Sequence, residues 1–571
     1  MAQGKAKIGD FFTRITDEWM RVNPDSATYF RYFTGPEQDA LDRKIAPLTD
    51  AEMRKRIAMV RKWLAELRTF DRAGLTQVER LSAESLEWQL QIISDEEPFL
   101  DFRFPLDQMN GWNVEAVDAM TVGRPVTKPR DAENYVVALG QVALRMDEAR
   151  ARARSQAAKG TLPPRFILQA TIRQLESFSD PAPAQNPFVT ALSTKLDLIK
   201  DITAAQRETA LRGAETAVAK QVYPAWKRAA AELRSQLPRA TDDAGIWRLK
   251  GGDKAYAYFL RRYTTTNMTP QQVHDIGLKR VAEIEAEMDA LLKQLGRTAG
   301  SVKERIAKLH ADLQYPNPTS EASRAQIIAD FDAVIRDAER RCEALFDLRP
   351  KAPLTVQPVP TFSENDMAAN YTTPAQDGSR PGIVQIPRRP SEMTKFGMRT
   401  LAYHEGVPGH HFQLALQAEN KELPRFRQLG AFGFVSASGE GWALYAERLA
   451  AESGWYDGDV EGRLGQLSDE LFRARRLVVD TGLHTKRWTR QQAIDYGVDA
   501  SEIDRYIVWP GQACSYMVGQ LKIIELREKA RTALGERFSL REFHNVVLEP
   551  GSVPLQVLER QVDAYIAKMR A

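Results

Sequence analysis

The sequence predicts a mainly α-helical protein with one small β-sheet placed just before a metal-binding motif. Residues 8–345 carry apolar side chains at helical spacing, in stretches rich in Ala, Leu, Arg, Lys and Glu. Residues 350–390 break this pattern with closely spaced prolines and short β-like runs. Helical character resumes at Ser391 and continues to the end of the chain.

The helices before residue 350 can be predicted in chain order. Residues 8–22 and 50–70 each carry an apolar stripe at helical spacing. Long Ala-, Arg- and Glu-rich stretches follow at 132–158, 203–236, 270–296 and 322–346. Proline-containing breaks separate them at 162–164, 180–183 and 315–318.

The predicted sheet lies at about residues 354–386. Its strands are the runs 354–359 and 382–386, and the turn sequence Asp377-Gly-Ser-Arg-Pro-Gly382 separates extended segments. We expect residues 1–350 to form a helical region and residues 351–571 to form a second region that contains the sheet and the metal-binding motif. The two regions are expected to make one continuous structural unit.

The bulk composition is that of an ordinary globular protein and excludes some functions. Among 571 residues, 79 are basic and 76 acidic, so a nucleic-acid binder that depends on phosphate contacts is not expected. No apolar run is long enough to span a bilayer, so no membrane insertion is expected. We expect a cytoplasmic protein, or a periplasmic or secreted one if a signal peptide was removed. Cys342 and Cys514 are expected to be buried free thiols.

The segment with the densest cluster of potential metal-binding and acid–base side chains is the octapeptide from His404 to His411, His-Glu-Gly-Val-Pro-Gly-His-His. It holds three of the seven histidines, and Glu405 directly follows the first. Imidazole is the commonest metal-binding side chain, and a carboxylate beside a bound metal can act as general base. We therefore interpret His404 as a ligand of Zn²⁺ and Glu405 as the catalytic base.

The second histidine ligand depends on how the backbone passes Pro408. On a straight helix His411 would share a face with His404 but lie about 10 Å further along the axis, and His410 would point about 120° away. Pro408 disrupts the preceding turn, and Gly409 accepts unusual dihedral angles. A kink there favours His410 as the second ligand, with His411 as the alternative.

Two glutamates downstream complete the predicted centre. Glu440 and Glu447 are seven residues apart, so they share one face of a helix that starts near Ser436. We interpret Glu440 as the third zinc ligand. Glu447 is interpreted as a carboxylate that holds a ligand histidine in place.

Other polar residues are candidates for steadying the oxyanion or binding substrate. Tyr516 is the favoured oxyanion donor, with His484 as a second catalytic candidate that Asp480 would orient. Tyr506 is a candidate substrate-binding residue. Arg380 lies before the run 382–386, which is expected to be a sheet edge, and could grip a terminal carboxylate of a peptide lying along it.

The combined motifs resemble a bacterial family known as domain of unknown function 885. The resemblance rests on the octapeptide ending at His411 and on Gly-Glu-Gly-Trp-Ala-Leu-Tyr-Ala-Glu447. It extends through 377–382, 480–484, 506–513, 543–548 and 551–555. It implies an elongated multi-helix, zincin-like fold of the gluzincin-like metallopeptidases, with the sheet beside the zinc and a peptide-like substrate. It also implies a channel, of which residues 1–350 would form one wall and residues 351–571 the catalytic region.

The expected function is a zinc metallopeptidase that cleaves short peptides. One alternative is a zinc-dependent hydrolase of a non-peptide amide or ester, which would use the same residues. Another is a helical binding protein with a vestigial metal site, although such a site would not need Glu405. The sequence leaves the substrate and the oligomeric state open.

Overall fold

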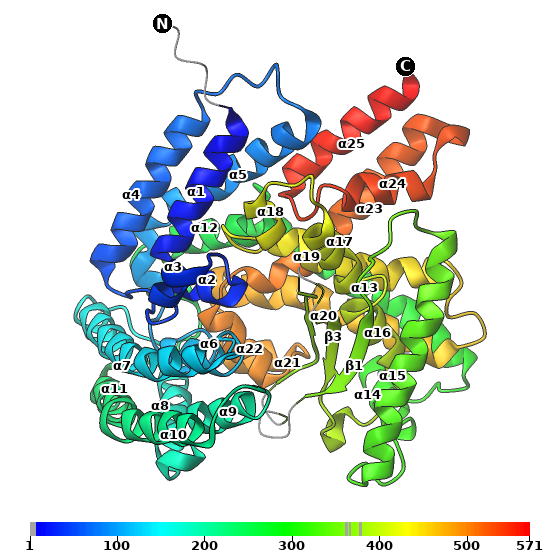
Figure 1. The fold of residues 1–571 in the computed structure, drawn as a ribbon. Coiled ribbons are helices and arrows are strands. Elements are labelled where there is room, and N and C mark those ends of the chain that lie inside the picture. The colour runs from blue at the N-terminus through cyan, green and yellow to red at the C-terminus, as the bar shows by residue number, and fades with distance from the viewer. Residues whose placement is uncertain (1–6, 360–363, 365–366, 376–377, 379) are drawn as a thin grey trace, which may run out of the picture.

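Helices make up most of the molecule, as predicted, and a single small sheet lies among them (Figure 1). The computed structural model describes residues 7–359, 364, 367–375, 378 and 380–571. None of the described helices combines the length and apolar character that crossing a bilayer requires.

The helix boundaries follow the sequence signals closely, and the first helix spans the residues predicted for it. Before the sheet lie α1 (Ile8–Val22), α2 (Pro24–Phe30), α3 (Gly35–Leu41), α4 (Asp50–Leu67), α5 (Gln77–Asp95), α6 (Trp112–Thr121), α7 (Pro129–Ala158), α8 (Arg165–Ser179), α9 (Pro187–Leu196), α10 (Ala204–Ala217), α11 (Tyr223–Gln236), α12 (Gly252–Thr264), α13 (Pro270–Gln294), α14 (Val302–Asp312) and α15 (Glu321–Arg341). After the sheet lie α16 (Met398–Glu405), α17 (His410–Glu419), α18 (Arg425–Leu429), α19 (Ser436–Glu452), α20 (Val460–Thr485), α21 (Arg490–Asp495), α22 (Ala500–Val508), α23 (Ser515–Leu534), α24 (Leu540–Leu548) and α25 (Leu555–Arg570).

Local capping explains where several of these helices begin. At α13 the side chain of Thr269 accepts a hydrogen bond from the backbone of Gln272, whose own side chain bonds back to the Thr269 backbone. The same reciprocal arrangement starts α5, α10, α14 and α21. Each cap satisfies backbone N–H groups that the first turn of a helix leaves free.

The sheet has three strands in the order β1–β3–β2. β1 (Leu354–Pro358) runs parallel to β3 (Gly382–Ile386), and β2 (Asn370–Thr372) runs antiparallel to it. The two predicted runs are both strands, whereas the short β2 was not predicted. The expectation that 382–386 forms a sheet edge is wrong, because β3 has a partner on each side.

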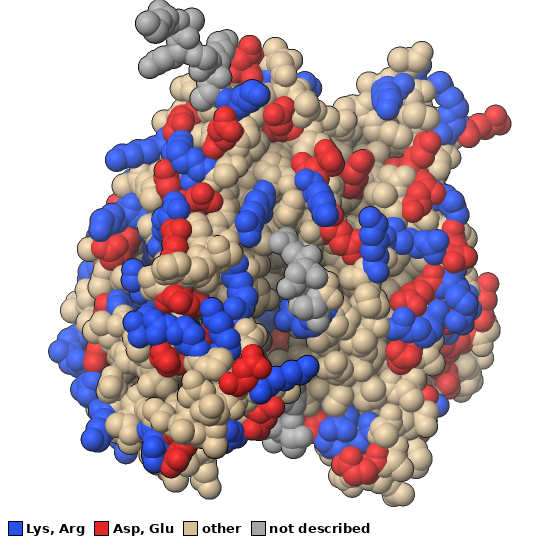
Figure 2. All heavy atoms as spheres, in the orientation of Figure 1, with Lys and Arg blue, Asp and Glu red and all other residues tan. Residues whose placement is uncertain are grey.

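The main hydrophobic core draws on both sides of residue 350, from Ile92 to Ile566. A second core lies mainly within α6–α11, the cyan and green helices at the lower left of Figure 1. A third joins α1, α4 and α5 to Phe426 and Phe432, which lie between α17 and α19. On the face shown in Figure 2, basic and acidic side chains are interspersed, so neither sign dominates it.

Close helix contacts fix the positions of α19 and α20. α20 lies along α13, where Gly277 allows the approach: a Cβ there would come within 2.8 Å of the Leu477 side chain. α19 crosses α23 at Gly441 and Gly519. A Cβ on Gly519 would overlap the carbonyl oxygen of Ala437, so this crossing requires glycine.

Gly519→Ala is therefore expected to destabilise the protein by about 1–3 kcal/mol or more, because the added methyl group must push α19 and α23 apart. Thermal unfolding of the variant measures this as a lowered Tm. Gly9→Ala is the matched control, since a Cβ on Gly9 of α1 would meet no atom within 4 Å. Equal Tm values for the two variants would show that the α19–α23 crossing tolerates a side chain.

Candidate metal centre and its pocket

The polypeptide breaks its helix between Glu405 and His410. α16 ends at Glu405 and α17 begins at His410, so the intervening residues 406–409 form a tight connection. A Cβ on Gly409 would overlap the carbonyl oxygen of His404, so only glycine fits there. The indole N–H of Trp442 donates to the carbonyl of Pro408 at 2.9 Å and ties this connection to α19.

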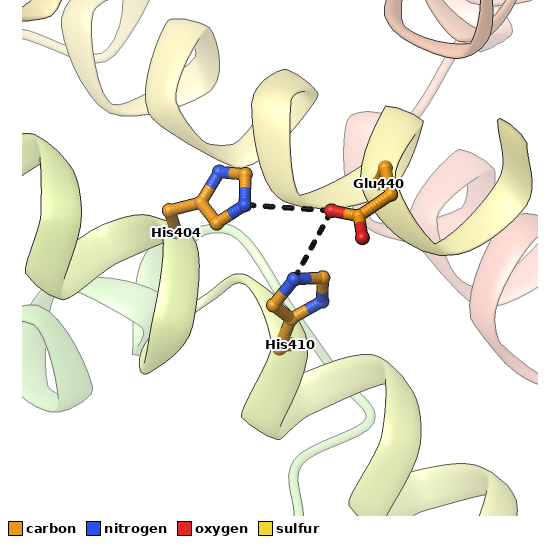
Figure 3. A group of neighbouring side chains, drawn as sticks. All are labelled: His404, His410 and Glu440. Carbon is orange, nitrogen blue, oxygen red and sulfur yellow. Dashed lines mark ion pairs between the residues drawn. The ribbon is translucent and has the colours of Figure 1, made fainter. Parts of the chain in front are cut away.

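Three side chains from three helices converge at this break (Figure 3). His404 comes from α16, His410 from α17 and Glu440 from α19. The Oε2 atom of Glu440 lies 3.6 Å from Nε2 of His404 and 3.4 Å from Nε2 of His410. The potential ligand atoms of all three residues lie within 4.8 Å of one another.

These separations fit a tetrahedral metal site. Zinc–ligand bonds of about 2.0–2.2 Å at tetrahedral angles place two ligand atoms about 3.4 Å apart. The Glu440–His404 and Glu440–His410 separations match that value. Two imidazoles and one carboxylate are also a donor set that zinc commonly takes in hydrolases.

Glu447 holds His404 in the orientation that such a site requires. Its Oε1 lies 2.6 Å from Nδ1 of His404, and the Glu447 side chain is completely buried. A carboxylate at Nδ1 fixes the proton there and leaves Nε2 free to bind a metal. Burial raises the pKa of Glu447, an effect that Arg473 and His404 partly offset.

The alternative ligand His411 lies outside this cluster. Its Nδ1 is 3.0 Å from the hydroxyl of Tyr371, and a Cβ on Gly382 would approach that nitrogen to 2.7 Å. The ring therefore packs against β2 and β3. Burial lowers the pKa of His411 to about 4, so the ring is neutral at physiological pH.

Glu405 is buried beside the cluster without belonging to it. It lines the same pocket as His404, His410 and Glu440. Burial raises its pKa, although the two histidines act in the opposite direction. A carboxylate beside a metal site is placed to accept and return a proton.

The pocket in front of these residues has a volume of about 700 Å³. Its walls are partly apolar, formed by Phe331, Phe396, Met398, Leu401, Leu414 and Phe472. Asn370 and Tyr371 of β2 also line it, which brings the sheet to the pocket. This volume suits a ligand of a few residues.

The two tyrosines singled out from the sequence take different positions. Tyr516 lines the pocket, and its hydroxyl lies 3.4 Å from Nη2 of Arg505. Tyr506 does not line the pocket. It is completely buried, donates to Glu502 at 2.8 Å and accepts from Nε of Arg476 at 3.0 Å. Tyr506 is thus in a position to support an arginine, and a direct contact with substrate is not available to it.

The prediction that His484 serves the site must be corrected, because the structure places it in the core away from the pocket. Its Nδ1 accepts from the backbone N–H of Ile246 at 3.1 Å, and Nε2 lies 3.0 Å from the carbonyl of Tyr506. Asp480 does not orient it, since their closest approach is 3.8 Å. Asp480 instead accepts hydrogen bonds from Tyr256 and from the N–H of Gly511.

The expected role of Arg380 also needs correction. Its side chain is exposed, does not line the pocket, and donates to the carbonyl of Thr373 at 2.9 Å. Its own carbonyl accepts from the N–H of Ala375. Arg380 therefore braces the connection between β2 and β3, and of its predicted turn motif Asp377 and Ser379 lie outside the described residues.

Sequence reasoning missed the four arginines that line the pocket, of which Arg473, Arg476 and Arg505 come from α20 and α22 and Arg389 from the segment after the sheet. Arg473 and Arg476 stand in the run Phe-Arg-Ala-Arg-Arg-Leu-Val-Val of α20, a helix that is buried along most of its length. Basic residues on a largely apolar helix were the signal available in the sequence. A buried arginine needs a partner, and such a need often marks a binding site.

Comparisons with known proteins identify relatives of the whole chain. Residues 24–562 match a family described as "Bacterial protein of unknown function (DUF885)". A crystal structure of "the putative lipoprotein" from Colwellia psychrerythraea is 32% identical, covers 98% of this chain and 99% of its own, and has a TM-score of 0.92.

A second structure is more distant. It is described as a "putative lipoprotein of unknown function" from Shewanella oneidensis, is 18% identical and has a TM-score of 0.72, with coverage of 97% and 99%. At that identity it shows the shared fold alone. A search of curated proteins gives no match. None of these descriptions names a reaction or a metal.

The two neighbouring histidines allow a direct test of the metal centre. His410→Ala is expected to lower zinc affinity at least about 100-fold, because a ligand is lost, whereas His411→Ala should retain one zinc per chain. Elemental analysis and competition with a chromogenic chelator measure both. Zinc loss from His411→Ala with retention by His410→Ala would assign the ligands the other way.

Asp480 gives a prediction for pH dependence. Burial raises its pKa from 3.8 to about 7, so between these values the folded chain keeps a proton that the unfolded chain releases. The free energy of unfolding therefore falls as pH rises through this window. Asp480→Asn removes the titration, and from pH 4 to pH 7 the wild type should lose about 3 kcal/mol of unfolding free energy relative to the variant. Urea unfolding of both proteins across this pH range measures the change. A difference in unfolding free energy between wild type and variant that stays constant with pH would contradict the prediction.

Proposed function

Because the chain belongs to the DUF885 family of bacterial proteins, whose function is unknown, we propose its activity from its own geometry: it is a zinc-dependent hydrolase of peptide bonds in short peptides. The observation that carries this proposal is the spacing of His404, His410 and Glu440. Beside them lies the carboxylate of Glu405, which is not one of the three potential ligands. A purely structural site would not need that fourth group.

Each residue around the centre has a part in the proposed reaction. A zinc ion held by the three ligands would polarise the substrate carbonyl and lower the pKa of a water molecule. Glu405 accepts the proton from the attacking water and passes it to the departing amine. Tyr516 faces the same pocket and is the candidate donor to the oxygen that gains negative charge.

The pocket favours a peptide over other amides and esters. β2 pairs with β3 along one side, and Asn370 and Tyr371 line the pocket. Among the described residues its other edge has no strand partner. An extended peptide can add to such an edge through backbone hydrogen bonds, which a non-peptide amide or ester cannot do. A panel of peptides, simple amides and esters separates these two substrate classes.

The relatives bear on where the protein acts. The similar structure from Colwellia psychrerythraea is described as a "putative lipoprotein". Of the compartments that the sequence leaves open, this description supports the periplasmic one.

Glu405→Gln is expected to keep zinc and to lose about 10²–10⁴-fold or more of peptide hydrolysis, since the change preserves shape and removes the base. Turnover of a short-peptide library by mass spectrometry, with zinc content measured on the same preparations, tests it. Glu422→Gln, on an exposed connection outside the pocket, is the control. Full activity of zinc-loaded Glu405→Gln would remove Glu405 from the mechanism.

A further inference from the structure

The proposed hydrolysis assigns no role to three largely buried arginines of the pocket wall, Arg473, Arg476 and Arg505. Arg473 and Arg476 lie one turn apart on α20, and Arg505 lies on α22. The side chains of Arg473, Arg476 and Arg505 are 11%, 5% and 12% exposed, although all three line the pocket. Burying guanidinium groups is costly unless each is paired.

Arg476 is held rigidly and still keeps bonding capacity. Its Nε donates to Tyr506 at 3.0 Å and its Nη2 to Glu502 at 2.9 Å. The guanidinium carbon lies 4.3 Å from the ring centre of Phe472 and 4.5 Å from that of Tyr516. Its Nη1 is buried and, within the described part of the chain, has no hydrogen-bond partner.

The charges around Arg476 do not balance. Glu502 accepts from Arg476 and also from Nη1 of Arg505 at 3.1 Å, so one carboxylate faces two guanidinium groups. Nε of Arg505 is likewise buried without a partner among the residues described. Arg473, by contrast, has Asp469 at 2.7 Å. One positive charge is therefore in excess at Arg476 and Arg505.

This excess charge lies close to the metal ligands. Nη2 of Arg473 is 3.9 Å from Oε1 of Glu447, the atom that bonds to His404. Arg476 is three residues further along α20, a rise of about 4.5 Å. Arg476 and Arg505 also line the same pocket as the proposed metal ligands, so a short peptide bound at those ligands can extend to the two arginines with one of its ends.

We propose that Arg476 and Arg505 bind a carboxylate of the substrate, namely its free C-terminus, so that the protein acts at the C-terminal end of peptides. Arginine holds a carboxylate through two parallel hydrogen bonds, and a guanidinium fixed by aromatic rings loses little entropy in doing so. The statement that cleavage occurs near the C-terminus rests on the proposed hydrolase function, whereas the carboxylate-binding site itself does not. Arg476 and Arg505 thus have the carboxylate-binding role that the sequence analysis assigned to Arg380.

Binding without turnover provides the first test. Zinc-loaded Glu405→Gln is titrated by calorimetry with an acetylated tripeptide as free acid, as its C-terminal amide, and as an amide ending in Asp. The free acid is expected to bind at least about tenfold more tightly than the first amide. Equal binding of acid and amide overturns the proposal. If the Asp amide matches the free acid, the assignment to the C-terminus is overturned.

Substitutions locate the subsite. Arg476→Gln and Arg505→Gln, each in the Glu405→Gln background, should reduce the preference for the acid to threefold or less, whereas Arg475→Gln should keep it. Arg475 is the matched control because it stands on the same helix but pairs with Glu285 and does not line the pocket. If Arg476→Gln fails to fold, Arg505→Gln decides alone. A preference that survives substitution overturns the proposal.

Kinetics with the wild-type protein separate this proposal from the previous one. Zinc-loaded protein should hydrolyse free-acid peptides with a lower KM than their amides, and Arg505→Gln should remove that difference mainly through KM. A preference in binding without hydrolysis of either peptide would support the carboxylate subsite and overturn the peptidase function.

Discussion

The buried carboxylate of Glu447 is the contact on which the site depends. It has no exposure to solvent, it bonds to Nδ1 of His404, and it lies 3.9 Å from Arg473. Burying a carboxylate is costly, and these two partners offset part of that cost. Through these contacts α19 is joined to α16, which carries His404, and to the arginine-bearing helix, α20. The same side chain thus positions a proposed metal ligand and one wall of the pocket.

Most of the fold could be predicted from the sequence, because helices depend on local periodicity and caps. The stretches 8–22 and 270–296 illustrate this, since an apolar stripe marks the first and the capping residue Thr269 marks the start of the second. The order of the sheet could not be predicted in the same way. β2 has three residues, too few for a periodic signal, and its pairing made β3 central rather than an edge. The mistaken expectation for Arg380 follows directly from that error.

The residues of the site that are close in sequence could be predicted, whereas those that depend on distant partners could not. His404, His410 and Glu405 are adjacent in sequence, and Pro408 with Gly409 indicated the break that brings them together. The partners of His484, in contrast, are the backbone groups of Ile246 and Tyr506. Every residue has backbone groups, so a pattern of residue types does not show which of them will bond to a histidine. The spacing of a histidine in the sequence therefore cannot distinguish a structural role from a reactive one. The proposed role of Arg476 and Arg505 could not be predicted from the sequence, because it depends on both residues sharing Glu502. That arrangement joins α20 to α22 and is visible only in the folded structure.

The third hydrophobic core has a consequence for how the protein is made. The indole of Trp19 donates to the carbonyl of Ala431, a contact that spans 412 positions, and Phe12 packs on Phe426. At synthesis rates of roughly 5–20 residues per second, α1 waits roughly 20–80 s on the ribosome for these partners. α4 and α5 can cover part of its apolar face early, but the part that meets Phe426 and Phe432 stays uncovered during that time, and a chaperone that shields it would keep the nascent chain from aggregating. The packing of α1 is thus completed only after α18 has been made, and it then covers the segment that joins α17 and α19.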